Sequence, residues 1–276
     1  MERRSTAAGP SSRPGNFWSN SGLSLSLMSL RIAFDLDGVL ADMDGALRRE
    51  ASRLGIGSEE ATVQGKTAPS DDSAPSIASM SDREQQSLWA AVRQIENFWV
   101  TLDELEPDSV RRLDALAAAR RWEVLFITTR PPTAGETVQR QSQRWLERSG
   151  FCLPSVYVIS GSRGKVASAL DLDIVVDDRP DNCIDVKADS RARAILVLPR
   201  SDGTPADPGR RCLGERALHL GIGVVQSVRE CLDLLEALEP AEGGRHRTAR
   251  ASLMTRLSQR LGLGDTASGS PRVTNR

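Results

Sequence analysis

Short apolar runs recur along the central part of the chain, and most of them end in a cluster of polar residues. The runs have the length and the β-branched content of buried strands, and stretches with helical spacing of apolar residues separate them. We expect strands at residues 31–34, 123–127, 156–159, 173–176, 194–198 and 223–225. We expect helices at residues 107–120, 133–149, 164–170, 180–188 and 227–238. This alternation predicts an α/β fold with a Rossmann-like, doubly wound parallel sheet.

The segment 43–106 interrupts the alternation. It carries two further helical patterns, at 45–54 and 82–95, with a polar stretch between them. It also holds three aromatic side chains in a chain with few aromatics: Trp89, Phe98 and Trp99. Such side chains could form the core of this segment, or they could stack on the base of a substrate.

Two carboxylates follow the first predicted strand. Asp35 and Asp37 come directly after it, and Gly38 lets the backbone turn there. Ligands of open α/β sheets bind at the carboxyl ends of the strands. Buried acids that converge at this edge repel each other unless a proton or a cation lies between them. The pair therefore predicts a site for a hard metal ion.

Three later segments place polar groups at the same edge. They contribute Thr128, Thr129 and Arg130 after the second strand, Lys165 at the start of a helix, and Asp177 and Asp178 after the fourth strand. Because the carboxyl ends of parallel strands share one edge of a sheet, we expect these groups to face one rim.

Each of these groups also has a purely structural interpretation. The threonines could simply finish a strand, and Lys165 could be a solvated helix residue. Asp178, Asp181 or Asn182 could cap the helix that Pro180 begins. The order of all four segments favours the chemical interpretation over the structural one.

The segments DLDGVLAD at 35–42, ITTRP at 127–131, the lysine at 165 and VDDRPDN at 176–182 resemble the haloacid dehalogenase (HAD) superfamily of aspartate-nucleophile phosphatases. The resemblance covers residues 31–198. Within the superfamily these segments are most similar to the 5'(3')-deoxyribonucleotidase group, which often has Thr-Ser-Pro where this chain has Thr-Thr-Arg-Pro.

The resemblance implies an Mg²⁺-dependent phosphomonoester hydrolase that works through an aspartyl-phosphate. Asp35 would be the nucleophile, and Asp37 would protonate the leaving oxygen and then activate water. Lys165 would be the third catalytic residue, a fixed positive charge. The metal set would be Asp35, Asp37 through its backbone carbonyl, Asp177 and the nearby Asp178.

The same resemblance implies how the substrate is held and how the chain is divided. Thr128, Thr129, Arg130 and Lys165 would bind the substrate phosphate. The HAD-like catalytic core would comprise residues 29–42 and 107–240, with a helical cap inserted at 43–106. Residues 1–28 and 241–276 lack the apolar content of a core, so we expect a disordered N-terminal extension and a basic, mostly disordered tail.

A nucleoside monophosphate, with a deoxyribose in particular, is the leading expectation for the substrate, because of the motifs and the aromatic side chains of the cap. Another small metabolite such as a sugar phosphate is the alternative within the same class. A HAD-fold binding or regulatory protein without turnover is the alternative from a different class, and phosphoryl transfer to an acceptor other than water also fits the motifs.

Composition narrows the class of protein. A net charge of −1 with mixed signs speaks against a duplex nucleic-acid partner, and no stretch approaches the length of a membrane span. The chain has two histidines and four cysteines without a CxxC pair, which argues against a zinc site and for a reducing compartment. We therefore expect a cytoplasmic enzyme with a small phosphorylated metabolite as its partner.

Overall fold

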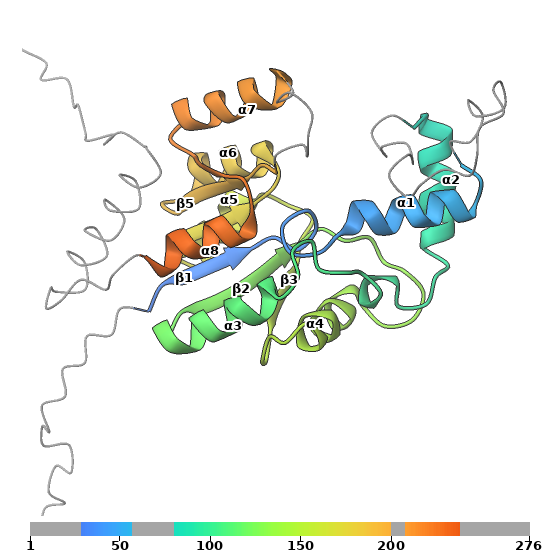
Figure 1. Cartoon of the computed structure of the whole chain (residues 1–276), viewed down its shortest axis with the longest axis horizontal. Helices are drawn as coiled ribbons and strands as arrows, with labels where there is room; N and C mark the ends of the chain where they lie inside the picture. Colours follow the sequence, from blue (N-terminus) through green and yellow to red (C-terminus); the bar gives the residue numbers. More distant parts are fainter. Residues whose placement is uncertain (1–28, 57–79, 200–207, 238–276) are drawn as a thin grey trace, which may run out of the picture.

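All strands of the described chain pair in parallel and form a single sheet (Figure 1). The structure is a computed structural model, and it describes residues 29–56, 80–199 and 208–237. The strands are β1 Arg31–Phe34, β2 Glu123–Thr128, β3 Ser155–Val158, β4 Ile174–Asp177, β5 Arg193–Val197 and β6 Gly223–Val225. Their order across the sheet is β3-β2-β1-β4-β5-β6. This order confirms the predicted doubly wound sheet, and the chain changes direction across the sheet between β1 and β4.

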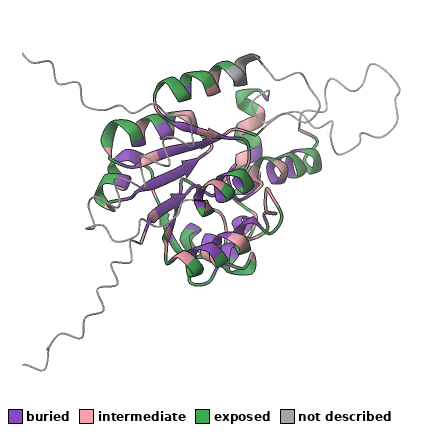
Figure 2. Cartoon of the chain, turned by 60° about the vertical axis from the view of Figure 1, so that its left-hand side comes forward, coloured by how far each residue is buried: buried purple, intermediate pink, exposed green. Residues whose placement is uncertain are grey.

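Helices cover both faces of the sheet. They are α3 Ser109–Arg120, α4 Val138–Arg148, α5 Arg163–Ala169, α6 Pro180–Asp189, α7 Pro208–His219 and α8 Val228–Glu236. Two further helices, α1 Met43–Arg53 and α2 Asp82–Val92, belong to the insertion after β1. One buried cluster joins Phe34 to side chains of α3, α4 and α8, and a second joins Ala33 to α5, α6 and α7. The two clusters lie on opposite faces because successive strand residues point to opposite sides. Figure 2 shows the buried strands between helices with exposed outer surfaces.

Most of the predicted elements are present, and several ends differ by a few residues. The helix expected over 133–149 begins only at Val138, because the side chain of Thr137 accepts a hydrogen bond from the Arg140 N–H and caps it there. The sequence pattern did not predict α7. Ala217 is the one buried residue among the side chains described on that helix, so no apolar stripe marks it.

The chain leaves the sheet after β1 and returns to it at α3. In between it forms α1, α2 and a short 3-10 turn, η4 Phe98–Val100. Helices α1 and α2 lie on the side toward which β1 and β2 run (Figure 1). The core cluster that contains Phe34 continues into this segment through Leu47, Leu88 and Trp99. The insertion therefore packs at the edge of the sheet where the site was predicted, and its role as a cap stays a prediction.

The predictions for residues 1–28 and 241–276 lie outside the described residues, as does the polar stretch at 57–79. Within the described ranges, every helix is too short or too polar to cross a bilayer. The carboxyl ends of β1, β2 and β4, where the site was predicted, lie in the described part of the chain.

Candidate active site

Two buried carboxylates meet where β1 and β4 end. Asp35 follows β1 directly, and Asp177 is the last residue of β4; the two side chains belong to adjacent strands. The Asp35 N–H donates to the Val176 carbonyl at 2.8 Å, which extends the strand pairing to this residue. Asp35 is 7 % exposed and Asp177 is 1 % exposed. The strand order places both acids at the switch point of the sheet, the crevice in which open α/β folds bind ligands.

A single guanidinium contacts both acids. Arg163, the first residue of α5, donates from Nη2 to Asp35 Oδ1, and its Nε lies 3.4 Å from Asp177 Oδ2. The Arg163 residue is 5 % exposed, and its Nη1 is buried without a hydrogen-bond partner among the described residues. A buried donor without a partner costs free energy, so this nitrogen is suited to an anionic ligand that enters beside Asp35.

Lys165 does not join this cluster, which corrects the prediction that it supplies the positive charge. Residues 163 and 165 lie about 200° apart around a helix, so they cannot face the same site. Ser162 caps α5 by accepting from the Lys165 N–H at 3.0 Å, and the Lys165 side chain is exposed. The sequence offered one signal for Arg163: it is a basic residue, like Lys165, and it directly follows Ser162, which caps the helix.

Close packing of α5 on α6 fixes which of the two basic residues faces inward. A Cβ added to Gly164 would lie 2.1 Å from the backbone oxygen of Asp185, so the helices approach at a glycine. With Gly164 held against α6, the phase of α5 directs Arg163 to the carboxylates and Lys165 to solvent.

Hydrogen bonds hold Asp177 in a fixed orientation. Its Oδ1 accepts from the Arg179 N–H at 2.9 Å, and Asn182 Nδ2 lies 3.0 Å from both of its oxygens. Asn182 is a site residue that the sequence reasoning named only as a possible helix cap. The expected cap of α6 by Asp178 or Asp181 is wrong: Arg179 occupies the N-cap position and makes no side-chain capping bond, although Pro180 does begin the helix.

Asp178 lies against the turn that follows β1. Gly38 has a φ of +80°, and a Cβ at that position would lie 2.2 Å from Asp178 Oδ2. The positive φ strongly favours glycine at 38, and a Cβ there would displace the Asp178 carboxylate. Burial and the neighbouring Asp177 raise the pKa of Asp178 to about 7. Burial, and then the charge of Asp177, also raise the pKa of Asp35 well above its usual range, although Arg163 opposes the shift.

The raised pKa values of Asp35 and Asp178 reflect burial first and the negative charge of neighbouring acids second. Four acids, Asp35, Asp37, Asp177 and Asp178, gather at this edge. Arg130 contacts Asp37, Arg163 contacts Asp35 and Asp177, and the charge of Arg179 acts on Asp178. The hard oxygen donors of the acids suit Mg²⁺, which commonly takes one or two carboxylates together with waters and substrate phosphate. No group of three or more His, Cys, Asp or Glu side chains within the described ranges is arranged to hold a metal ion. The residues thus fit a Mg²⁺ with two carboxylate ligands but not a cage made by the protein alone.

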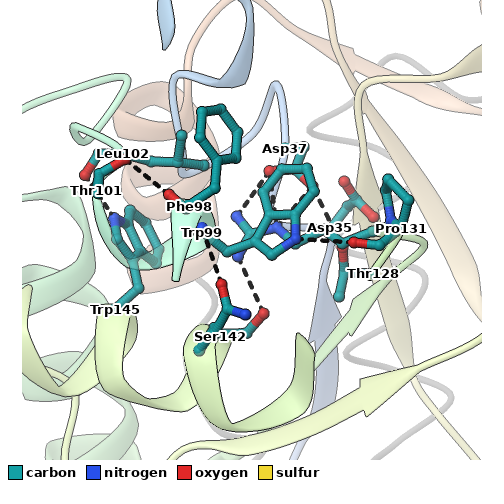
Figure 3. A network of polar contacts seen from close by, with 12 residues as sticks. Asp35, Asp37, Phe98, Trp99, Thr101, Leu102, Thr128, Pro131, Ser142 and Trp145 are labelled. Atoms are coloured by element: carbon teal, nitrogen blue, oxygen red, sulfur yellow. Dashed lines mark hydrogen bonds and ion pairs between the residues drawn. The ribbon is translucent and has the colours of Figure 1, made fainter. Parts of the chain in front are cut away.

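Asp37 is held by other side chains and is not free to serve as a carboxylate ligand. Arg130 grips both of its oxygens, with Nε 2.9 Å from Oδ2 and Nη2 2.7 Å from Oδ1. The Thr128 hydroxyl donates to Oδ2 at 3.3 Å (Figure 3). Only the backbone carbonyl of Asp37 therefore remains as a metal ligand.

The same contacts engage two of the residues predicted to bind phosphate, and for both that role stays a prediction. Thr128 is fully buried, and its donor is used by Asp37. Arg130 is 4 % exposed, and each of its three guanidinium nitrogens already donates to Asp37 or to Ser142. Thr129 is exposed at the end of β2, and its role stays a prediction.

The aromatic side chains of the insertion are mostly core. Phe98 is 4 % exposed and Trp99 is fully buried, which favours the structural interpretation for both. The Trp99 indole N–H donates to the Pro131 carbonyl at 2.9 Å (Figure 3). Trp89 alone keeps partial exposure, and it borders an open hollow on α2 with Arg93. Support for base stacking is thereby reduced to Trp89.

Comparison with known proteins adds information about the fold alone. No protein-family model matches the chain, and no curated protein sequence matches it. A HAD family hydrolase from Deinococcus radiodurans, solved with bound phosphate and sodium, has 16% identity and a TM-score of 0.45, with 83% of this chain and 99% of that chain covered. A phosphonoacetaldehyde hydrolase-like protein from Oleispira antarctica has 16% identity and a TM-score of 0.43, with coverage of 84% and 95%. A haloacid dehalogenase-like family hydrolase from Xanthomonas campestris has 14% identity and a TM-score of 0.43, with coverage of 82% and 98%. At such identities the similarity is one of fold, between this chain and hydrolases of the HAD type.

Proposed function

We propose that this chain is an Mg²⁺-dependent phosphomonoester hydrolase of the HAD superfamily that works through a phosphorylated Asp35. The observation that carries the proposal is the buried pair of Asp35 and Asp177 at the switch point, with the guanidinium of Arg163 in contact with both. Together these three side chains offer a nucleophile, a metal ligand and a fixed cation within one small volume.

The first step needs cations because a carboxylate attacks an anion. The repulsion between two unit charges is about 4 kcal/mol at 4 Å for an effective dielectric near 20. Arg163 opposes it, and its free Nη1 donor is suited to a phosphoryl oxygen. Asp35 and Asp177 would hold a Mg²⁺, which would supply further positive charge when bound. The bond from Asp35 to phosphorus forms as the ester bond breaks, and Asp37 gives the leaving oxygen its proton.

The second step regenerates the nucleophile. A water attacks the phosphorus of the aspartyl-phosphate, Asp37 takes a proton from that water, and inorganic phosphate leaves with its bond to Asp35 broken. The ionised carboxylate of Asp37 is the form that this step requires. Arg130 and Thr128 donate to that carboxylate, so their contacts suit its role as a base.

The position of Asp37 favours a phosphatase over a haloacid dehalogenase. An aspartate nucleophile could also displace halide from carbon, but a halide leaves as a stable anion and needs no proton donor. An alkoxide leaving group does need one. A second acid held two residues from the nucleophile therefore fits a phosphomonoester better than a haloacid.

The substrate that we propose is a small phosphomonoester, with a nucleoside monophosphate as the first choice because of the motifs. Partial exposure of Trp89 beside Arg93 is the one feature of the insertion that still supports contact with a base. A sugar phosphate is the alternative, and it requires no aromatic contact.

A substrate panel tests the proposal. Phosphate release would be measured over nucleoside monophosphates, sugar phosphates and p-nitrophenyl phosphate, with Mg²⁺ and with EDTA, and halide release would be measured from chloroacetate. We expect Mg²⁺-dependent phosphate release that Asp35→Asn abolishes and that the exposed control Arg140→Lys leaves unchanged. Halide release without phosphate release would overturn the proposal in favour of a dehalogenase. If neither phosphate nor halide is released, the proposal is refuted altogether.

A further inference from the structure

The contact between Arg130 and Asp37 has the geometry of a positioning device. The guanidinium presents two nitrogens to the two oxygens of one carboxylate, at 2.9 Å and 2.7 Å. Such a planar fork fixes both the place and the rotation of the carboxylate, whereas a single donor fixes only a distance. Asp37 lies in the turn beyond β1, and the other described side chain that donates to its carboxylate is Thr128, with a single hydroxyl at 3.3 Å.

Arg130 is itself immobilised from the side opposite Asp37. Its Nη1 donates to Ser142 Oγ at 3.0 Å, and its side chain is fully buried. The guanidinium carbon lies 4.9 Å from the ring centroid of Trp99 and 6.0 Å from that of Trp145. Stacking on aromatic rings and a fixed acceptor leave the fork one orientation.

The two tryptophans are anchored in turn. The indole N–H of Trp99 donates to the Pro131 carbonyl at 2.9 Å, and the indole N–H of Trp145 donates to the Leu102 carbonyl at 2.8 Å. Trp99 belongs to η4 of the insertion and Trp145 to α4, so Arg130 is held between two elements that are distant in sequence. Figure 3 shows Asp37, Trp99, Ser142 and Trp145 in this one network.

We propose that Arg130 is a positioning residue for Asp37, and that it does not bind substrate phosphate. The inference rests on the proposed function, since it assigns Arg130 a task in that reaction. A proton donor must lie within hydrogen-bond reach of the leaving oxygen, and a displacement of about 1 Å can cost on the order of 10²-fold in rate. Lysine cannot replace arginine here, because an ammonium group offers no planar fork.

A double-mutant cycle separates this role from phosphate binding and from a merely structural role. The variants are Arg130→Lys, Asp37→Asn and the combination, with Arg140→Lys as a matched, exposed arginine control. Ser142→Ala is a milder second variant, which removes one acceptor from Arg130 and keeps the experiment informative if Arg130→Lys fails to fold. Steady-state kcat and KM would be measured with p-nitrophenyl phosphate and with the best alkyl phosphate of the substrate panel, and folding would be followed by circular dichroism.

If Arg130 positions Asp37, Arg130→Lys lowers kcat by on the order of 10²-fold with little change in KM. The loss is larger for the alkyl phosphate than for p-nitrophenyl phosphate, whose leaving group needs little protonation. In the Asp37→Asn background the same substitution costs less than about 3-fold, since there is no acid left to position. Ser142→Ala follows the same pattern with a loss of about 5-fold, the rate equivalent of one ordinary hydrogen bond.

Losses that multiply in the double variant, or a rise in KM with unchanged kcat, would overturn the positioning role while leaving the proposed function intact. A wild-type protein that releases no phosphate from any substrate would overturn both. Wild-type kcat in a folded Arg130→Lys variant would also refute the positioning role.

Discussion

Arg163 is the residue on which the electrostatics of the site depend. It contacts Asp35 and Asp177, which are both nearly inaccessible to solvent. Burial is the largest cause of the raised pKa of each acid, and Arg163 is the cation that opposes the shift in both. Its removal would leave two like charges buried together, so we expect a loss of stability as well as of turnover.

Arg163→Met and Lys165→Met form a matched pair that tests this assignment. Loss of one partner of a buried ion pair typically costs about 3–5 kcal/mol, so Arg163→Met should lower the free energy of unfolding by an amount in that range. It should also abolish phosphate release. Lys165→Met should change stability by less than about 0.5 kcal/mol, as an exposed substitution. Urea unfolding and phosphate release would be measured for both, and a large loss of activity in Lys165→Met alone would contradict the placement of α5.

The raised pKa of Asp178 predicts that the stability of the metal-free protein depends on pH. Its pKa is raised to about 7 in the folded state, first by burial and then by Asp177, against about 3.9 for a free side chain. The folded state keeps a proton that the unfolded state has already lost, so stability falls as pH rises from about 4 to about 7 and is level above that. In EDTA the melting temperature should be higher at pH 5 than at pH 8. Asp178→Asn should reduce the difference, and an unchanged difference in that variant would refute the shift.

At the scale of residues, motif spacing was sufficient to predict which acidic residues lie together, but not which basic residues contact them. Asp35 and Asp177 end adjacent strands, so the alternation of elements already placed them together. The choice between Arg163 and Lys165 depends on the phase of one short helix, which no local pattern specifies. The contact of Arg130 with Asp37 joins positions 93 residues apart, and sequence periodicity carries no information about such a pair.

At the scale of elements, the packing of α5 on α6 determines what the site contains. Gly164 touches the backbone of Asp185, and backbone cannot move aside as a flexible side chain can. A larger residue at 164 must push α5 away from α6. Because Arg163 is the neighbouring residue, that displacement would move the guanidinium away from the carboxylates.

Gly164→Ala tests this coupling, with Gly161→Ala as the matched glycine control. Overpacking of this kind costs about 1–3 kcal/mol, and we expect Gly164→Ala to lower the melting temperature and to reduce kcat together. A Cβ at Gly161 meets no atom within 4 Å, so Gly161→Ala should leave both unchanged. Thermal melting and steady-state kinetics would be compared for the two variants. Full activity in Gly164→Ala would show that the position of α5 does not control the site.

The elements themselves were predictable to the extent that they carry apolar faces. Five of the six strands are mostly buried, whereas β3 at the edge of the sheet buries only Val156, and the ends of all six lie within a few residues of the prediction. Helix α7 escaped prediction because Ala217 alone is buried among those of its side chains that the structure describes. The turn η4 escaped because three residues are too few for a periodic pattern, although its Trp99 anchors the support of Asp37.

At the scale of the whole molecule, the strand order determines where chemistry can occur. β1 lies between β2 and β4, so the ends of these three strands bring together Asp35, Thr128 and Asp177 from three distant parts of the chain. The insertion between β1 and α3 packs over the same edge and reaches Arg130 through Trp99. An alternating βα pattern was sufficient to predict the sheet, whereas the side-chain contacts of the insertion with that edge required the structure.

Asp35 becomes phosphorylated in the proposed mechanism, and the most direct test is to look for that phosphoryl group. The Asp37→Asn variant would be mixed with p-nitrophenyl phosphate and Mg²⁺, quenched in acid and digested, and the peptide that contains Asp35 would be fragmented in a mass spectrometer. The leaving group needs no acid, so phosphorylation should proceed while hydrolysis of the intermediate is slowed, and we predict a phosphoryl group on Asp35 that is missing in Asp35→Asn. Nitrophenolate release without a phosphorylated Asp35, or wild-type turnover by Asp35→Asn, would contradict the mechanism.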